Sequence, residues 1–258
     1  MKTAFATLAM LASIALGSPI ETSGPIETAK PVLNARDDII PADVGTAVNG
    51  ALDAIPVTVK AVAPPATMTM SIINSAGVVL TTTHGYNSGA VPVVGNSAPG
   101  TIAVGATAVA AMQTGWAGNV AFNDARWPIL GDVESLIEGS FVTWPGTVNE
   151  NTGVISLDVS YVSGFSMPIS CFCGSQTGKY LSGCDKNLWA LNPCPDDQNN
   201  AAGSCRNPRR YQADVLSALP FFSACAGLAY TYPVDEGADS ANECQEPGVI
   251  TCVVYPSH

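Results

Sequence analysis

The stretch from Ile155 to Pro168 reads Ile-Ser-Leu-Asp-Val-Ser-Tyr-Val-Ser-Gly-Phe-Ser-Met-Pro. From Ile155 to Tyr161 every second residue is apolar, and the residues between them are serines and one aspartate. This period of two predicts a β-strand with one buried and one solvated face, within a strand candidate that spans Val154–Val162. The serine and glycine that follow are typical of a turn, and Met167–Phe172 is the next strand candidate.

Similar runs fill the chain from Thr67 onward, separated by Gly, Pro, Asn and Ser. The other strand candidates are Met68–Ile73, Val78–Thr82, Ala90–Val94, Thr101–Val109, Val120–Phe122 and Ser135–Val142. The first two flank Asn-Ser-Ala-Gly and therefore indicate a strand, a turn and a strand. Many short strands at this spacing favour a β-sandwich or barrel over βαβ units. One short helix is predicted over Gln212–Leu219, which has apolar residues at helical spacing and ends before Pro220.

The N-terminus has the pattern of a secretory signal peptide. Met1-Lys2 precedes an apolar run that ends in small residues, and this run is shorter than the roughly 20 apolar residues of a spanning helix. We assign residues 1–17 to the signal peptide. Residues 18–65 contain a Pro-Ile-Glu-Thr repeat and few bulky residues, which predicts a pro-segment or disordered linker. Residues 66–258 form the predicted domain of a secreted, extracellular protein, with cell-wall association as an option.

The balance of charges restricts the partners. The chain has 10 Lys and Arg against 21 Asp and Glu, a formal net charge of −11. Nucleic acid and anionic lipid attract basic proteins, so neither is a predicted partner. No later segment is long and apolar enough to span a bilayer, so no membrane span is predicted. We expect a monomer whose partner is a polysaccharide or an extracellular protein.

Eight cysteines lie in the last third of the chain: Cys171, Cys173, Cys184, Cys194, Cys205, Cys225, Cys244 and Cys252. An even number behind a signal peptide predicts disulfide bonds, because the secretory pathway is oxidising. A metal site is not predicted, since there is no Cys-x-x-Cys motif and the two histidines are His84 and the terminal His258. Spacing alone leaves the pairing of the cysteines open.

Several motifs resemble those of the thaumatin-like (osmotin) family. Ile155–Pro168 resembles its signature, in which an Asp-Val-Ser strand runs into Gly-Phe-Asn-x-Pro, and Leu136–Phe141 and Gly115–Gly118 are similar to two of its other strands. Phe221–Cys225 and Ala229–Asp235 are similar to its C-terminal segment. The motifs occur in the family's order, as in a divergent, fungal-type member. The resemblance implies a mostly β fold: a thaumatin-like flattened β-sandwich with a disulfide-rich lobe of loops and short helices.

The resemblance also implies a site and a disulfide pairing. The family's cleft holds one Arg and four acids, and many members bind or cleave β-1,3-glucan. By position, three of the acids correspond to Glu138, Asp158 and Asp235, whereas Asn123 replaces the Arg and Ser163 replaces the fourth acid. The implied disulfides are Cys194–Cys205, Cys184–Cys225, one of Cys171 and Cys173 with Cys244, and the other with Cys252, because the family's N-terminal cysteine is missing.

Two carboxyl groups on either side of a sugar bond are sufficient for hydrolysis. If the site is catalytic, Glu138 is the predicted acid and Asp158 the base or nucleophile, while Asp235, Asn123 and Ser163 belong to the binding part of the cleft. Against this interpretation, a single acid on a strand is usually a solvated, outward-facing residue. The tryptophans followed by proline, Trp127 and Trp144, are candidates for stacking on sugar rings.

Three functional hypotheses follow. The preferred one is a secreted protein that binds cell-wall polysaccharide of the β-1,3-glucan class through an acidic cleft without strong catalysis. The second is a weak endo-β-1,3-glucanase that uses Glu138 and Asp158. The third is a secreted antigen or effector that acts through protein contacts and has no glycan role. None of them calls for a cofactor or a metal.

Overall fold

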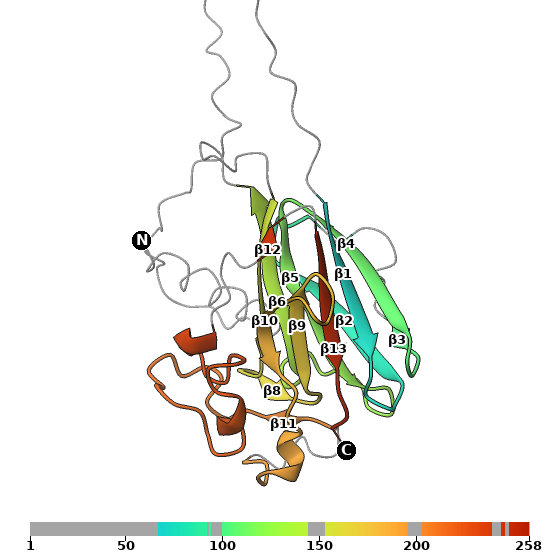
Figure 1. Cartoon of the computed structure of the whole chain (residues 1–258). Coiled ribbons are helices and arrows are strands. Elements are labelled where there is room, and N and C mark those ends of the chain that lie inside the picture. Colours follow the sequence, from blue (N-terminus) through green and yellow to red (C-terminus); the bar gives the residue numbers. More distant parts are fainter. Residues whose placement is uncertain are drawn as a thin grey trace, which may run out of the picture. The chain divides into compact units, whose positions relative to one another are not determined.

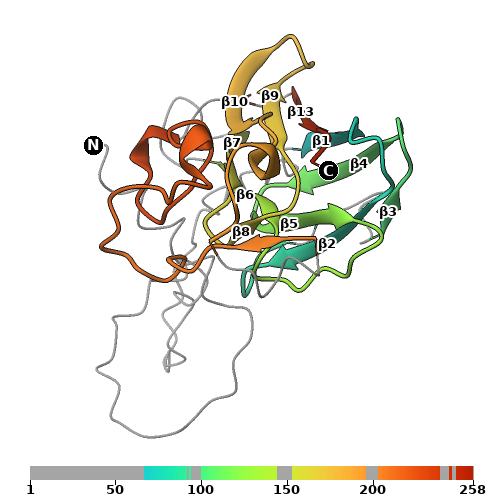
Figure 2. The ribbon, with the colours of Figure 1, turned by 90° about the horizontal axis from the view of Figure 1, so that it is seen from below.

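The computed structural model describes residues 67–91, 93, 100–143, 153–195, 203–238, 244–245 and 248–257. The predicted signal peptide and the predicted linker lie outside these ranges, so both stay predictions. The described chain folds into two face-to-face β-sheets with a lobe of loops beside them (Figures 1 and 2). The predicted fold class, a mostly β sandwich rich in disulfides, is confirmed. In the described part of the chain, no helix has the length and apolar character needed to cross a membrane.

The first sheet has five strands and joins the two ends of the domain. Its order is β10 (Lys179–Cys184), β9 (Ile169–Cys173), β13 (Gly248–Val254), β1 (Thr67–Asn74) and β4 (Thr107–Gln113). The first and last strands, β1 and β13, are parallel neighbours, and the other pairs are antiparallel. The sheet is therefore complete only when the C-terminal strand is in place.

The second sheet has six strands and comes mostly from the middle of the chain. Its order is β12 (Cys244–Gln245), β7 (Gly153–Ser160), β6 (Ser135–Thr143), β5 (Trp116–Asp124), β2 (Leu80–Tyr86) and β3 (Thr101–Ile102). All its pairs are antiparallel. Polar residues that alternate with the apolar ones in β5, β6 and β7 point away from the first sheet, because successive side chains of a strand face opposite sides.

The core lies between the sheets and follows the alternating pattern of the sequence. β1 contributes Met68, Met70 and Ile72, and the second sheet contributes large side chains such as Ile137 and Phe141; all are at most 3% exposed. Each such side chain stabilises the fold by about 1.5–3 kcal/mol relative to an exposed position. The period of two in the sequence therefore arises from burial of one face of each strand.

Aromatic side chains and short elements form the lobe. It includes β8 (Gly164–Phe165), β11 (Cys205–Arg206) and the short 3₁₀ helices η1 (Leu188–Ala190), η3 (Ser223–Cys225) and η4 (Glu236–Ala238). The Phe165 ring packs edge-on against Tyr161 at 5.1 Å and Phe221 at 5.8 Å between ring centroids. This aromatic cluster connects the lobe to the end of β7.

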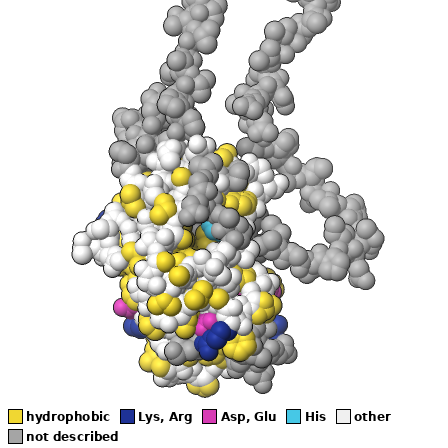
Figure 3. Space-filling model, turned by 90° about the vertical axis from the view of Figure 1, so that its right-hand side faces the viewer, with side chains coloured by type: hydrophobic (Ala, Val, Ile, Leu, Met, Phe, Trp, Pro, Cys, Tyr) yellow, Lys and Arg dark blue, Asp and Glu magenta, His cyan; other side chains and the backbone are white. Residues whose placement is uncertain are grey.

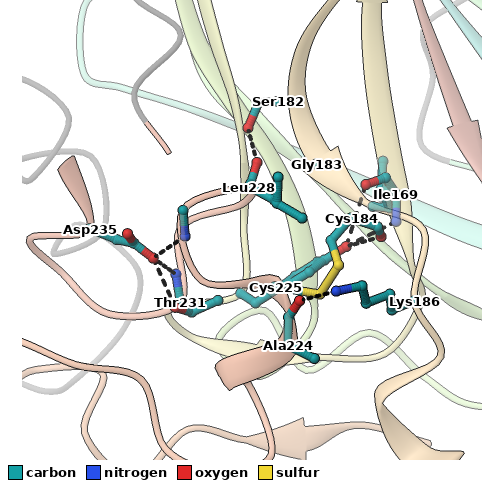
Figure 4. Close-up of a disulfide and its surroundings, with 12 residues drawn as sticks. Ile169, Ser182, Gly183, Cys184, Lys186, Ala224, Cys225, Leu228, Thr231 and Asp235 are labelled. Carbon is teal, nitrogen blue, oxygen red and sulfur yellow. Dashed lines mark hydrogen bonds between the residues drawn. A yellow bond between two sulfur atoms is a disulfide. The ribbon is translucent and has the colours of Figure 1, made fainter. Parts of the chain in front are cut away.

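The eight cysteines form four disulfides: Cys171–Cys252, Cys173–Cys244, Cys184–Cys225 and Cys194–Cys205. The pairing that the family resemblance implied is confirmed. Cys184–Cys225 attaches η3 to the end of β10, and Lys186 Nζ donates to the Ala224 carbonyl beside it at 2.7 Å (Figure 4). The Gly183 N–H donates to the Leu228 carbonyl at 2.7 Å. The lobe is therefore joined to β10 by a covalent bond and by backbone hydrogen bonds.

The predicted helix over Gln212–Leu219 is wrong. This segment consists of turns, and the Leu216 side chain is 79% exposed. An isolated stretch this short forms a stable helix only when packing covers its apolar face, and no such packing covers Leu216. The apolar residues before Pro220 therefore do not form a helix, because Leu216 among them stays exposed.

Two strand predictions also differ from the structure. The candidate Thr101–Val109 is divided into β3 and β4 by a turn at Gly105, where φ is +72°. β1 and β2 do not pair with each other; the turn between them crosses from the first sheet to the second. Of the candidate Ala90–Val94, residues 90, 91 and 93 are described and are not part of a strand.

Candidate functional site

A row of polar side chains crosses the outer face of the second sheet. Glu138 of β6 lies directly opposite Asp158 of β7 on one side and Asn119 of β5 on the other. Their chain neighbours Ile137, Val120 and Val159 are at most 1% exposed and belong to the core. The three polar side chains therefore point outward together, and directly opposite residues of neighbouring strands have Cβ atoms about 5 Å apart.

A glycine of β2 lies beside Asn119, at the end of the row away from the lobe. Gly85 of β2 is paired with Asn119. A Cβ atom on Gly85 would come within 2.8 Å of Asn119 Oδ1. A larger residue at this position would therefore force the Asn119 side chain to move.

Glu138 has an unusual electrostatic environment. The side chain is half-buried, but its Oε1 atom is shielded from solvent and has no hydrogen-bond partner among the described residues. Burial raises the pKa of Glu138 to about 7; a hydrogen bond with Ser160 opposes this shift and the nearby charge of Asp158 adds to it. Below about pH 7 the carboxyl group is thus mainly neutral and carries a proton that it can donate.

The lobe closes one end of the row. The Tyr161 N–H donates to the Tyr230 carbonyl at 2.7 Å, and the Tyr230 N–H donates to the Val159 carbonyl at 2.9 Å. The segment around Tyr230 therefore continues the edge of β7 next to Ser160, which is 2% exposed. Asp158, at 9% exposed, is likewise well shielded. The shielding that raises the pKa of Glu138 thus extends over the neighbouring strand.

Asp235 is 2% exposed and holds a turn of the lobe. Its Oδ2 accepts hydrogen bonds from Thr231 Oγ1 at 2.9 Å and from the N–H groups of Thr231 and Gly227 at 3.3 Å each (Figure 4). These donors give the carboxylate a structural role in the turn around Tyr230. The expectation that Asp235 shares one groove with Glu138 and Asp158 stays a prediction.

The other two predicted binding residues also take part in structural contacts. Asn123 is fully buried at the end of β5, where its Oδ1 accepts from the Asp124 N–H at 2.9 Å and its Nδ2 donates to the Pro128 carbonyl at 3.3 Å. Ser163 lies between β7 and β8, and its carbonyl accepts from the Asn207 N–H at 3.0 Å. Asn123 therefore anchors the loop after β5, and Ser163 connects the β7–β8 turn to the lobe.

Of the two tryptophans predicted to stack on sugar rings, Trp127 lies within the described residues. Trp127 is half-buried and packs on the backbone of Gly203, where an added Cβ would come within 2.3 Å of its ring. Trp144 lies outside the described residues. Within the described ranges, no group of three or more His, Cys, Asp or Glu side chains is arranged to hold a metal ion.

Asn119 and Ser160 belong to the site but were not predicted from the sequence. Asn119 is the polar residue at an outward position of β5, so the alternation in Trp116–Phe122 was a usable signal. Its position next to Glu138 depends on the strand register, which the alternation does not give. Together, Asn119, Glu138, Asp158 and Ser160 offer hydrogen-bond donors and acceptors that suit a ligand rich in hydroxyl groups.

No protein-family model matches the chain, and no curated protein sequence matches it. Among the solved structures, the chain is similar to the crystal structure of the protein elicitor MoHrip2 from Magnaporthe oryzae. The identity is 10%, the TM-score is 0.36, and the match covers 72% of this chain and 98% of the other.

Proposed function

We propose that this chain is a secreted, divergent thaumatin-like protein that binds neutral cell-wall polysaccharide of the β-1,3-glucan class at Glu138 and Asp158. The observation that carries the proposal is the Glu138 Oε1 atom, which is shielded from solvent and unpartnered among the described residues. A buried polar atom without a partner costs about 1–3 kcal/mol. Because solvent does not reach Oε1, a ligand hydroxyl group can hydrogen-bond it only when the half-buried Glu138 side chain shifts outward, and the bond then recovers that free energy.

Secretion is supported by the cysteines. Each of the eight is paired in one of four disulfides, and disulfides persist in oxidising compartments. The predicted signal peptide at residues 1–17 agrees with this location. The likeness in motif order remains the support for the family, and the four disulfide pairs agree with it.

A titration with soluble β-1,3-glucan oligosaccharides tests the proposed function. We expect Glu138→Gln and Asp158→Asn each to weaken binding about tenfold, because each changes a hydrogen bond at a shielded site. Asp214→Asn is a control of the same chemical type at an exposed position of the lobe, and it should bind as the wild type does. If the wild type binds no glucan oligosaccharide, the proposal is wrong and the interaction-protein hypothesis replaces it.

The weak glucanase is a second candidate, and one observation favours it. The pKa of Glu138, raised to about 7 mainly by burial, suits a general acid, and its carboxylate partner lies directly across one strand spacing. Opposite residues of neighbouring strands have Cβ atoms about 5 Å apart, a spacing from which the carboxyl groups can take the separation of about 5 Å that the retaining mechanism uses. Release of reducing sugar from β-1,3-glucan that is lost in Glu138→Gln would establish this activity; equal release by both proteins excludes it.

A further inference from the structure

The strands of the five-stranded sheet put no charged side chain on its outer face; a charge close to this face is that of Asp185, directly after β10, which adds to the raised pKa of Tyr180 and of Tyr255. Lys179, at the start of β10, is the one charged residue in the five strands, and it precedes the outward-facing Tyr180, so it points to the other side of the strand. From one edge to the other, the residues that lie side by side on the outer face are Tyr180, Phe172, Thr251, Ser71 and Val109. In a chain of net charge −11, this face is exceptional.

Aromatic side chains gather at one end of this face. Phe172 and Tyr180 pack edge to face with ring centroids 5.9 Å apart. Tyr255, which follows β13, shares a hydrogen bond with Ser170 on the same face. Burial raises the pKa of Tyr180 to about 12, so its phenol stays neutral under physiological conditions. We call the outward side chains of the five strands, together with Tyr255, the neutral face.

The neutral face is held rigidly and is partly open to solvent. The Tyr180 hydroxyl donates to the carbonyls of Gly183 and Leu228, the latter at 3.1 Å. Val249 and Val109 are 40% and 41% exposed, as is Tyr180 at 41%. Figure 3 views the molecule from the side where β4 and β3 lie; most of the charged atoms visible there are in the lower half, and hydrophobic atoms are spread over the rest. A ligand that covers the face would therefore displace water from apolar groups and lose little charge solvation.

The dimensions of the neutral face argue against a protein partner. Five strands about 4.8 Å apart, each rising about 3.3 Å per residue, give a face of roughly 20 by 20 Å, or about 400 Å². A stable protein–protein interface buries about 800 Å² on each partner. Aromatic rings beside hydroxyl groups on a nearly flat surface instead match sugar rings, which present apolar faces and hydroxyl edges.

We propose that the neutral face is a second binding surface, one that lies against the surface of an insoluble, uncharged polysaccharide. It is distinct from the Glu138–Asp158 pair because the two lie on the outer faces of opposite sheets. The class of ligand rests on the proposed function, but the residues and the physical form of the ligand differ. The pair takes a single sugar chain, whereas the neutral face takes an array of chains.

The test measures depletion of the protein from solution by insoluble β-1,3-glucan and by chitin. We expect the double variant Val109→Asp/Val249→Asp to bind about tenfold more weakly, because an unpaired charge loses its hydration against an uncharged surface. The matched control is Val79→Asp/Val104→Asp, which adds the same charges at valines that are 41% and 55% exposed outside the five strands. Binding by the wild type should change little in about 1 M salt, since the strands bring no charge to the face and salt screens the charge of Asp185 beside it.

Three results overturn the proposal: no binding of the wild type to either solid, equal binding by both double variants, or a wild-type dimer that Val109→Asp/Val249→Asp dissociates in sedimentation. Thermal unfolding verifies that both double variants are folded. Titration with soluble oligosaccharides separates this proposal from the proposed function. The neutral-face variant should keep soluble binding, whereas Glu138→Gln should weaken soluble binding about tenfold and keep binding to the solid.

Discussion

The two outer faces of the sandwich have the same strand geometry but opposite chemistry. The face of the six-stranded sheet carries Asn119, Glu138 and Asp158 in one row, shielded next to the lobe. The strands of the five-stranded sheet put hydroxyl, aliphatic and aromatic side chains on their outer face and no charged ones. A sheet alone does not determine what its outer face can bind. What the outer face can bind also depends on the lobe that shields part of it, because a shielded carboxyl group has a different pKa from an exposed one.

The largest change in stability is expected from removing the Cys184–Cys225 disulfide, which attaches the lobe to β10. Cys184→Ala/Cys225→Ala opens a loop with a sequence separation of 41 residues, which should lower the free energy of unfolding by about 4 kcal/mol. Chemical denaturation measures this loss. Cys194→Ala/Cys205→Ala, with a separation of 11 residues, should cost about 3 kcal/mol. A larger loss of stability on removing Cys194–Cys205 would contradict the idea that Cys184–Cys225 is the more important attachment of the lobe.

The next effect concerns the turn that brings the lobe against β7. Asp235→Asn removes the charge from a buried side chain that accepts three hydrogen bonds, and the expected loss of unfolding free energy is about 2 kcal/mol. The neighbouring Glu236→Gln, at an exposed position, should change it by less than about 0.5 kcal/mol. Equal losses in the two variants would show that the Asp235 contacts do not stabilise the turn.

A third effect concerns the dependence of stability on pH. The pKa of Glu138 rises from 4.5 to about 7 in the folded protein, mainly through burial. The folded state therefore binds the proton more tightly than the unfolded state. The stability that this proton contributes is complete below about pH 4.5 and is lost as the pH rises through about 7. Glu138→Gln should remove this dependence and be more stable than the wild type at pH 8, by at most about 3 kcal/mol.

Denaturation curves at several pH values measure this difference between wild type and Glu138→Gln. Asp158→Asn should lower the midpoint of the transition, since the charge of Asp158 raises the pKa of Glu138. A wild type whose stability rises between pH 5 and 8 by the same amount as that of Glu138→Gln would refute the assignment.

The smallest change in the free energy of unfolding is expected for substitutions on the neutral face. Thr251→Val removes the hydrogen bond from its hydroxyl to the Gly174 carbonyl, for a loss of about 1 kcal/mol in thermal or chemical unfolding. Ser71→Ala, on the same face and half-buried, should cost less than about 0.5 kcal/mol. If Ser71→Ala costs more than Thr251→Val, Ser71 has a structural role that its pattern of contacts does not explain.

The sequence predicted the strands whose alternation reflects burial of one face. β1, β6 and β7 are close to the predicted ranges because their inward residues, such as Met70, Ile137 and Leu157, are buried. In the cysteine-rich third, the candidate Met167–Phe172 overlaps β9, whereas β10 to β13 were not predicted, since they are short or lack a clear period. The disulfide pairs came from the family resemblance, because spacing did not choose among them.

The candidate site was predicted only in part. Glu138 and Asp158 were named from the family motifs, and the structure places them side by side. Asn119 and Ser160 were missed, because the register between strands depends on long-range pairing that no local pattern encodes. The shielded environment of Glu138 depends on the lobe, whose segment around Tyr230 lies 70 residues away along the chain from Ser160.

The position of β13 between β1 and β9 has a consequence for biogenesis. During synthesis, β1 can pair with β4 and β9 with β10, yet β1 and β9 each keep one unpaired edge until residues 248–254 are made. Such edges invite pairing with other chains. The last strand closes both edges at once, and Cys252 then bonds to Cys171 on the neighbouring strand. The nascent chain is therefore most in need of a chaperone just before β13 is translated, and a truncation that removes β13 leaves two strand pairs with unpaired edges.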